Sequence, residues 1–291
     1  MNQIHIPVLS NEVVAQLRPA KGESYLDLTA GYGGHADKIL EVTQNYKDAV
    51  LNDRDANAIN YLEAKYQSEK PEITHDTFYN TALRLLESGT TFDIILADFG
   101  VSSPQLDKTE RGFSFTHDAR LDMRMDTQQE LDAWHIVNRW SERRLAEIFV
   151  EFGEESEGRA KMLVRQITHN RPVNTTAELA NLIKQRSGYS RVHPATKIFQ
   201  AIRIATNDEL GEITRTLPLL PKLLKPGGRV GIISFHSLED RLVKEYFKYI
   251  SEQGIESELR LLNKKPIVAD SIELDINPRA RSAKLRVVQK V

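Results

Sequence analysis

The sequence predicts an α/β protein in which a doubly wound parallel sheet is interrupted by a helical insertion. Three observations support this. Short β-rich runs alternate with helical stretches over the first hundred residues, the alternation stops after Asp107, and it resumes at about residue 206. The expected halves of the sheet domain are 1–107 and 206–291, and the expected insertion is 108–205.

The strands of this sheet are predicted from their β-branched and apolar runs. They are YLDLT (25–29), AVLND (49–53), EITHD (72–76), FDIILAD (92–98) and RVGIISF (229–235). Helix formers follow at 35–42 and 56–66, which gives the rhythm of a parallel sheet. The pieces ELRLLNK and AKLRVVQK near the C-terminus favour a closing antiparallel pair.

The insertion is predicted to be mostly helical. Its apolar residues recur at helical spacing, and the run Asn174-Thr175-Thr176-Ala177-Glu178 is typical of a helix start. A helix over about 207–224, a turn at 225–228 and a helix over 238–250 would then return the chain to the sheet.

Composition excludes several classes of protein. The chain has 291 residues, 40% of them hydrophobic, and no cysteine. A disulfide framework and a thiolate metal site are therefore excluded, and the eight histidines form no metal-binding motif, so no metal is expected. Without a run of about 18 apolar residues or a signal peptide, we expect a soluble cytoplasmic protein that does not enter a membrane.

Charge is segregated along the chain, although the net charge is only −2. Residues 159–203 carry nine Lys or Arg and one acid, Glu178, and residues 277–290 carry five and none. Two basic segments on an acidic body favour a bound polyanion such as nucleic acid. A solvated helix face whose arginines pair with acids elsewhere explains the same counts.

The loop after the first strand, Ala30-Gly31-Tyr32-Gly33-Gly34-His35, is suited to a nucleotide-like ligand. Its glycines let the backbone approach a ligand, and the helix that follows offers unpaired N–H groups. The spacing matches neither the dinucleotide fingerprint nor a P-loop. The loop alone does not identify the ligand.

Three further side chains are expected at the same edge of the sheet. Asp53 ends the second strand, where it either accepts ribose hydroxyls or caps the next helix. Phe78 follows the third strand and either stacks on an adenine or belongs to the core. Asp98 ends the fourth strand, and together these residues favour an adenosine-bearing cofactor.

Matching motifs extend over the whole chain. They are HIPVLSNEVV, DLTAGYGGH, DRDANAI, GVSSPQLD, ERGFSF, LDMRMD, EFGEE, HPATKIFQAIRIATNDELGE, PGGRVGIISFHSLEDRLVK and NPRARSAKLRV. The sequence thereby resembles the MraW family of bacterial ribosomal RNA small subunit methyltransferases. The resemblance implies a Rossmann-like class I S-adenosylmethionine-dependent methyltransferase sheet, S-adenosylmethionine as cofactor, and N4-methylation of a cytidine in the decoding region of 16S rRNA.

Carried over by position, the resemblance implies a set of cofactor contacts. They are Gly33, Gly34, His35, Asp53, Phe78, Asp98 and Gln105. This chain differs from the usual family pattern at Tyr32, where glycine is common, at Asn52, and at Ala97 and Phe99 on either side of Asp98.

The stretch from Asp98 to Gln105 suggests how an exocyclic amine is activated. The N4 lone pair of cytosine is delocalised, and acceptors that hold its N–H bonds stabilise positive charge as the methyl group arrives. Asp98, shared between amine and cofactor, and the carbonyl before Pro104, with Ser103 restricted to extended geometry, are the expected catalytic groups. Transfer would be in line, without the thiolate that carbon-5 cytosine methylation needs.

The insertion, 108–205, is the expected RNA-recognition domain, and 1–107 with 206–291 the expected methyltransferase domain. Arg165 and Arg186 are expected to contact phosphates, and Tyr189 to stack on a base. His236 could line the RNA side of the pocket, although Ser237 capping a helix explains that stretch too, as a helix N-terminus explains Asn207-Asp208-Glu209. The expected partner is 16S rRNA within the small ribosomal subunit, and a homodimer is left open.

Two rival functions remain at the level of the sequence. A nucleotide-dependent oxidoreductase explains the sheet and Asp53, but it requires a glycine fingerprint that is missing. An RNA-binding assembly factor that has kept the fold and lost its chemistry explains the basic insertion, but the intact acidic and Ser-Ser-Pro-Gln series argues against it.

Overall fold

The computed structural model describes residues 7–101, 109–186 and 193–291. The chain forms two compact units: unit 1 is Met1–Gly100 with Leu210–Val291, and unit 2 is Val101–Glu209. These limits are wider than the insertion of 108–205 expected from the sequence. Val101 packs against the core of unit 2, and the last helix of that unit continues to Asn207.

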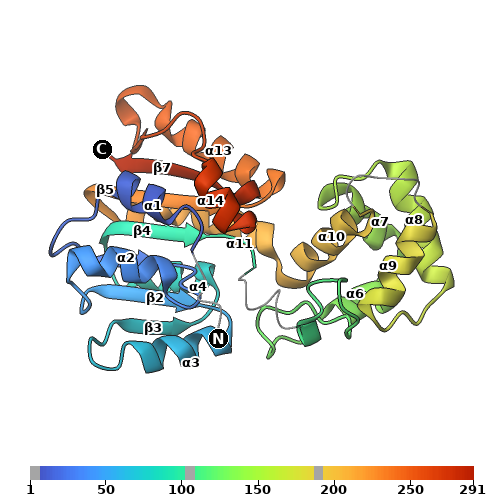
Figure 1. Ribbon diagram of the computed structural model, residues 1–291. Coiled ribbons are helices and arrows are strands. Elements are labelled where there is room, and N and C mark those ends of the chain that lie inside the picture. Colours follow the sequence, from blue (N-terminus) through green and yellow to red (C-terminus); the bar gives the residue numbers. More distant parts are fainter. Residues whose placement is uncertain (1–6, 102–108, 187–192) are drawn as a thin grey trace. The chain divides into compact units, whose positions relative to one another are not determined.

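Unit 1 contains a seven-stranded sheet (Figure 1). The strands are β1 (Tyr25–Asp27), β2 (Ala49–Asp53), β3 (Glu72–His75), β4 (Phe92–Asp98), β5 (Leu224–Ser234), β6 (Leu259–Leu261) and β7 (Lys284–Lys290). Their order in the sheet is β3-β2-β1-β4-β5-β7-β6. The first five strands in this order are parallel, and β7 is antiparallel to both of its neighbours. The predicted α/β, Rossmann-like fold and the closing antiparallel pair are thus confirmed.

Helices cover both faces of this sheet. They are α1 (Ser10–Leu17), α2 (Gly34–Thr43), α3 (Ala56–Lys65), α4 (Phe78–Glu87), α11 (Glu209–Thr216, whose first residue belongs to unit 2), α12 (Leu220–Leu223), α13 (Ser237–Ser251) and α14 (Ser271–Ile276). Successive side chains of a strand point to opposite faces. Tyr25 therefore belongs to the apolar cluster under α1, α2 and α3, whereas Leu26 belongs to the cluster under α4, α12 and α13.

Two local predictions need adjustment. The helix expected over about 207–224 is observed over 209–223, where α11 continues through a short 3-10 turn (Leu217–Leu219) into α12, and Asp208, in a left-handed conformation (φ 51°), separates it from the helix before it. The turn expected at 225–228 lies within β5, where the pairing with β4 shifts register between Phe92 and Ile94. The extra residues form a bulge, and pairing continues on both sides of it.

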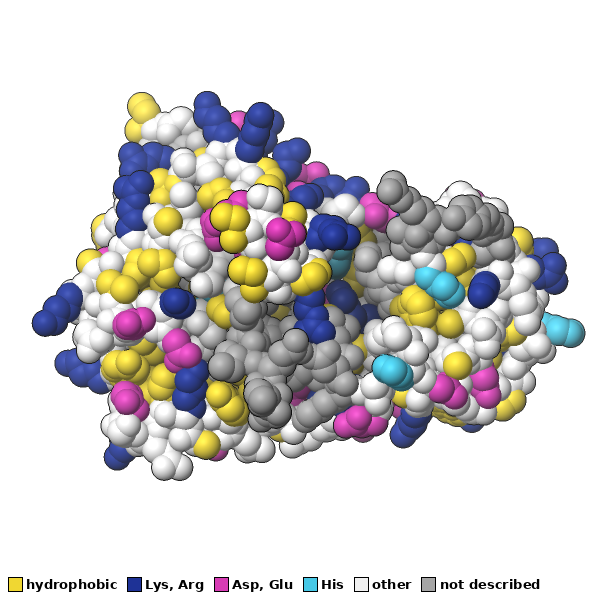
Figure 2. Space-filling view, viewed as in Figure 1, with side chains coloured by type: hydrophobic (Ala, Val, Ile, Leu, Met, Phe, Trp, Pro, Cys, Tyr) yellow, Lys and Arg dark blue, Asp and Glu magenta, His cyan; other side chains and the backbone are white. Residues whose placement is uncertain are grey.

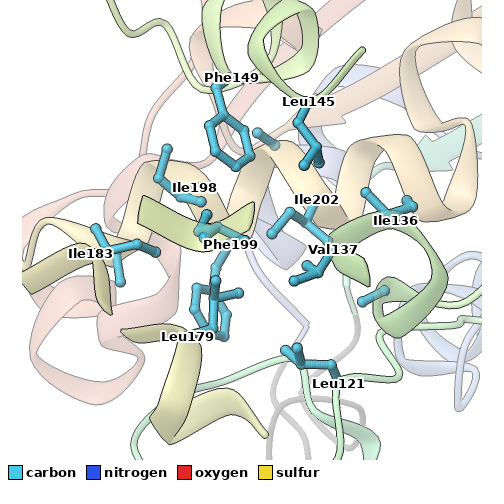
Figure 3. Close-up of a cluster of buried hydrophobic side chains, with 14 of the residues drawn as sticks. Leu121, Ile136, Val137, Leu145, Phe149, Leu179, Ile183, Ile198, Phe199 and Ile202 are labelled. Carbon is cyan, nitrogen blue, oxygen red and sulfur yellow. The ribbon is translucent and has the colours of Figure 1, made fainter. Parts of the chain in front are cut away.

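Unit 2 is helical and has a core of its own. Its helices are α6 (Ala133–Arg139), α7 (Glu142–Glu151), α8 (Glu157–His169), α9 (Thr176–Gln185) and α10 (Ala195–Asn207), after a 3-10 turn at Thr109–Arg111. Figure 3 shows side chains from α6, α7, α9 and α10 converging in this core, with Phe149 fully buried. Thr175 caps α9 in a capping box with Glu178, which confirms the predicted helix start.

Within its described residues, unit 2 contains no strand, only an isolated bridge between Arg120 and Thr175. Of all the helices in the described ranges, none combines the length and the apolar character needed to cross a membrane.

An ionisable pair lies inside the sheet domain at β1. The Tyr25 hydroxyl donates to Asp27 Oδ2 at 2.7 Å, and Thr29 N–H donates to Asp27 Oδ1 at 3.1 Å. Asp27 is 1% exposed, and its burial raises its pKa from 3.8 to about 6 despite these hydrogen bonds and the nearby His35. The charged form of this carboxyl is therefore destabilised in the folded protein.

Gly112→Ala should destabilise the protein more than Gly22→Ala. Both glycines have positive φ, which costs an alanine about 1–2 kcal/mol. At Gly112 a Cβ would also lie 2.3 Å from the Arg120 carbonyl oxygen, whereas at Gly22 it would meet nothing within 4 Å. We expect an additional loss of about 1–3 kcal/mol for the Gly112 variant. Equal urea midpoints for the two variants would contradict this packing.

Asp27→Asn should change how stability depends on pH. A raised folded-state pKa favours the protonated carboxyl, so the stability that Asp27 contributes is complete below pH 4 and is lost as the pH rises through about 6. This pKa shift corresponds to a loss of folding stability on the order of 3 kcal/mol. The free energy of unfolding of the Asn variant, relative to that of the native protein, should therefore increase between pH 4 and 7. Urea unfolding at several pH values measures this, and a constant difference would show that Asp27 does not titrate in this range.

Candidate cofactor and active site

The loops that follow β1, β2 and β4 are linked by hydrogen bonds at the carboxyl edge of the sheet. Gly31 N–H donates to Asp53 Oδ2 at 2.8 Å, and Asp98 N–H donates to the Thr29 hydroxyl at 2.6 Å. In open α/β sheets, ligands bind at this edge. The structure thus brings the glycine loop together with both predicted acids.

The backbone of the first loop depends on glycine. Gly31 and Gly33 have φ of 54° and 77°, whereas Tyr32 does not have a positive φ, which explains why a tyrosine is accepted there. A Cβ at Gly33 would lie 3.1–3.2 Å from side chains of α3 and Tyr66, and one at Gly34 would lie 3.2 Å from Pro7. Gly33 caps α2 without a side-chain hydrogen bond, so the first N–H groups of this helix are suited to an anionic group.

Asp53 is fixed by the backbone of two loops. Besides Gly31 N–H, it accepts Asp55 N–H at Oδ1, at 2.8 Å. The interpretation of Asp53 as the helix cap is wrong, because Asp55 is the cap of α3 and accepts Asn57 N–H. Burial raises the pKa of Asp53, while the backbone N–H bonds oppose the shift. The carboxylate has about four acceptor sites, so beside the N–H groups of Gly31, Asp55 and Arg54 it keeps one that a ribose hydroxyl could use.

Asn52 and Phe99, two of the positions that differ from the family pattern, have structural roles. Asn52 is buried and joins β1 to α4: its Nδ2 donates to Leu28 O at 2.9 Å, and its Oδ1 accepts the Thr81 hydroxyl at 2.7 Å. The Phe99 ring packs on Phe78 with 5.4 Å between centroids. Phe78 begins α4 and is half-buried at the margin of the core, so core packing accounts for one side of its ring.

His35 and Asp98 form a polar pair that has unused hydrogen-bonding atoms. His35 is 7% exposed, and its Nε2 lies 3.5 Å from Asp98 Oδ2. Neither ring nitrogen of His35 nor Asp98 Oδ1 has a hydrogen-bond partner among the described residues. Buried polar atoms are costly when unpaired. Such atoms beside a glycine loop fit a polar ligand that would satisfy them.

Sequence reasoning missed the residues that hold this pair in place. Thr29 joins the two acids, since its N–H donates to Asp27 and its hydroxyl accepts from Asp98 N–H. Asp27, the acid that begins the motif DLTAGYGGH, is the signal in the sequence that could have pointed to this link. Four predicted site residues, Ser103, Pro104, Gln105 and Tyr189, lie outside the described residues.

His236 is a helix cap in the structure. Its Nδ1 accepts Glu239 N–H at 3.4 Å, while Glu239 Oε2 accepts the N–H groups of Phe235 and His236 at 2.7 and 3.2 Å. The expectation that Ser237 is the cap is wrong, because Ser237 is the first residue of α13. Asn207 ends α10, and its side chain bonds to Met123 and Met125 within unit 2, whereas α11 begins at Glu209, so the helix N-terminus expected over 207–209 is confirmed for Glu209.

Many of the basic residues in the charge-rich segments have partners close by. Arg159 and Lys161 pair with Glu155 and Glu157 one helical turn away, and Arg171 donates to backbone carbonyls. At the C-terminus, Lys284 and Arg286 hold Asp240 and keep its pKa low. In the view of Figure 2, unit 2 shows Lys and Arg scattered among acidic side chains rather than one continuous basic area.

Arg165 and Arg186 remain exposed. Among the described residues neither pairs with a carboxylate, although Arg186 Nε lies 3.2 Å from Gln166 Oε1. Gln166 follows Arg165 on α8 and also bonds to Gln185, which precedes Arg186 at the end of α9. The two arginines therefore lie on neighbouring helices of unit 2.

Known proteins resemble this chain over nearly its whole length. The model of the MraW methylase family matches residues 2–291. "Ribosomal RNA small subunit methyltransferase H" of Synechocystis sp. is 45% identical over 294 residues, which cover 99% of this chain and 93% of that protein. The protein of the same name from Acidobacterium capsulatum is 43% identical over 297 residues, covering 98% of both chains.

These matches exclude the oxidoreductase alternative. They agree with the arrangement of the glycine loop, Asp53 and Asp98 at one edge of the sheet. The chain belongs to the MraW methylase family.

Proposed function

We propose that this methyltransferase transfers a methyl group from S-adenosylmethionine to the N4 amine of a cytidine in the decoding region of 16S rRNA. The observation that carries the proposal is the partly buried His35–Asp98 pair, whose unused polar atoms lie beside the glycine loop. The relatives named for the small ribosomal subunit support an rRNA substrate.

The cofactor of this methylase is S-adenosylmethionine, and the described residues fit it. Asp53 would hold the ribose hydroxyls, Phe78 would face the adenine, and the N-terminus of α2 at Gly33 and Gly34 would receive the carboxylate. Gln105 is assigned to the same site by the family resemblance. When bound, the cofactor supplies an electrophilic methyl group on its sulfonium.

Asp98 would act on the amine that is methylated. Its Oδ1, which forms no hydrogen bond with the described residues, would accept one amine N–H, and the carbonyl between Ser103 and Pro104 would accept the other. A carboxylate at this point stabilises positive charge on the nitrogen and provides an acceptor for the proton that N4 must lose. Positioning and exclusion of water supply the rest, with no covalent enzyme intermediate.

Unit 2 would recognise the RNA. Arg165 and Arg186 would contact phosphates, and Tyr189 would stack on a base that is unpaired or turned out of its helix. His236 remains a proposed neighbour of the substrate, although its ring is held as a helix cap. The protein would act in the cytoplasm, on 16S rRNA within the small ribosomal subunit, where the target base is presented in one pose.

Asp98→Ala and Asp98→Asn should abolish most of the methyl transfer. We expect kcat to fall about 10²–10³-fold for both, because each removes charge stabilisation at the amine. Labelled methyl transfer to small ribosomal subunits, free 16S rRNA and DNA, with the modified nucleoside identified by mass, measures this. Asp275→Ala, which removes a carboxyl of α14, is the matched control and should retain full activity.

The same assay decides the proposed function. N4-methylcytidine on subunits would support it, and a different nucleoside would refute it. Intact cofactor binding with no transfer to any acceptor would favour the RNA-binding assembly factor. Asp98 variants with native rates would place the site elsewhere.

Arg165→Glu with Arg186→Glu should weaken RNA binding and reduce its dependence on salt. The slope of log K against log[salt] should fall by roughly 0.7–0.9 for each phosphate that the variant no longer neutralises. Binding of 16S rRNA at several salt concentrations measures this. Lys47→Glu with Lys244→Glu applies the same charge change to unit 1. If both double variants lose affinity equally, RNA binding is not centred on α8 and α9.

A further inference from the structure

The last turn of α3 is attached to the glycine loop and to the first turn of α2. Lys65 Nζ donates to the Tyr32 carbonyl oxygen at 3.3 Å and forms an ion pair with Asp37 at 2.5 Å. The Tyr66 hydroxyl donates to the other oxygen of Asp37 at 2.7 Å. None of these residues was singled out from the sequence.

These contacts hold the loop at a second point, one residue after its contact with Asp53. Asp53 accepts the N–H of Gly31, and Lys65 donates to the carbonyl of the next residue, Tyr32. The Tyr32 ring also lies against Tyr61 of α3, with 5.1 Å between centroids. A loop fixed at two such neighbouring points loses little further freedom when a ligand binds, which favours affinity.

The contacts also set the charge at the N-terminus of α2. Asp37 lies in the first turn of this helix, where its negative charge would repel an anionic ligand group. The ammonium of Lys65 compensates that charge directly. The Tyr66 hydroxyl remains protonated as a donor, because burial, and then its hydrogen bond to Asp37, raise its pKa.

We infer that Lys65 is a positioning residue for the cofactor: it holds the glycine loop and neutralises Asp37, so that the N-terminus of α2 can accept the carboxylate end of S-adenosylmethionine. The inference rests on the proposed function. Lys65 is 24% exposed and Asp37 49%, so the pair is accessible to solvent and its loss should leave the fold intact.

The test uses the full chain and calorimetric binding of S-adenosylmethionine, which needs no RNA. Lys65→Met keeps the apolar stem and removes the ammonium, and it should weaken cofactor binding about 10-fold. Lys65→Arg should restore most of the affinity. Lys38→Met, which removes an exposed lysine next to Asp37 on the same helix, should bind as the native protein does.

Kinetics separate positioning from general damage. For Lys65→Met, KM for the cofactor should rise about 10-fold, while kcat at saturating cofactor and the melting temperature without ligand stay near native values. Removing the opposing charge as well, in Asp37→Asn with Lys65→Met, should recover part of the affinity that Lys65→Met alone loses.

Native affinity in Lys65→Met would overturn the inference, and so would a loss matched by Lys38→Met or by a fall in melting temperature. A double variant that binds no better than Lys65→Met would also refute the neutralisation of Asp37. These failures differ from failure of the proposed function, in which the native protein would bind S-adenosylmethionine but would not form N4-methylcytidine on the small ribosomal subunit.

Discussion

The parallel pairing of β1 with β4 is the constraint on which the site depends. Tyr25, Leu26 and Asp27 pair with Ile94, Ile95 and Leu96, and Leu28 N–H continues the ladder to Leu96 O at 2.9 Å. This register brings Thr29 to the backbone of Asp98. A slip of one residue would turn Asp98 to the opposite face of the sheet and separate it from His35. The large apolar area buried on both faces therefore fixes the distance between two polar loops.

The site concentrates acidic groups where water is scarce. Burial raises the pKa of Asp27 and Asp53, and His35 and Asp98 retain buried polar atoms without partners among the described residues. A sheet optimised only for stability would have apolar residues or complete hydrogen-bond networks there. Groups with perturbed pKa and unsatisfied atoms are typical of functional sites, where they are retained at a cost in stability. The surrounding apolar clusters offset this cost.

The number of Lys and Arg residues in the sequence of unit 2 overstates the positive charge that its surface can offer to a ligand. Its helices have their own apolar core, which includes Phe149 and Ile202, and the basic residues around it are partly used in local ion pairs and in bonds to carbonyls. Exposed ion pairs of this kind contribute little to stability, but they reduce the positive potential that reaches a distant phosphate. Unit 2 therefore keeps fewer unpaired cations than its sequence contains.

The sequence by itself determined the strands of the sheet, the helical nature of the insertion, and the glycine loop with Asp53 and Asp98 at strand ends. These features depend on local periodicity, on β-branched runs and on chain order, which a linear pattern contains. Only the tertiary structure decided which acid caps α3, that Thr29 joins Asp27 to Asp98, and that Lys65 compensates Asp37 across 28 positions of sequence. The physical reason is that partners distant in sequence are brought together by burial of apolar faces, and the side-chain types alone do not specify which of many possible hydrogen bonds that burial selects.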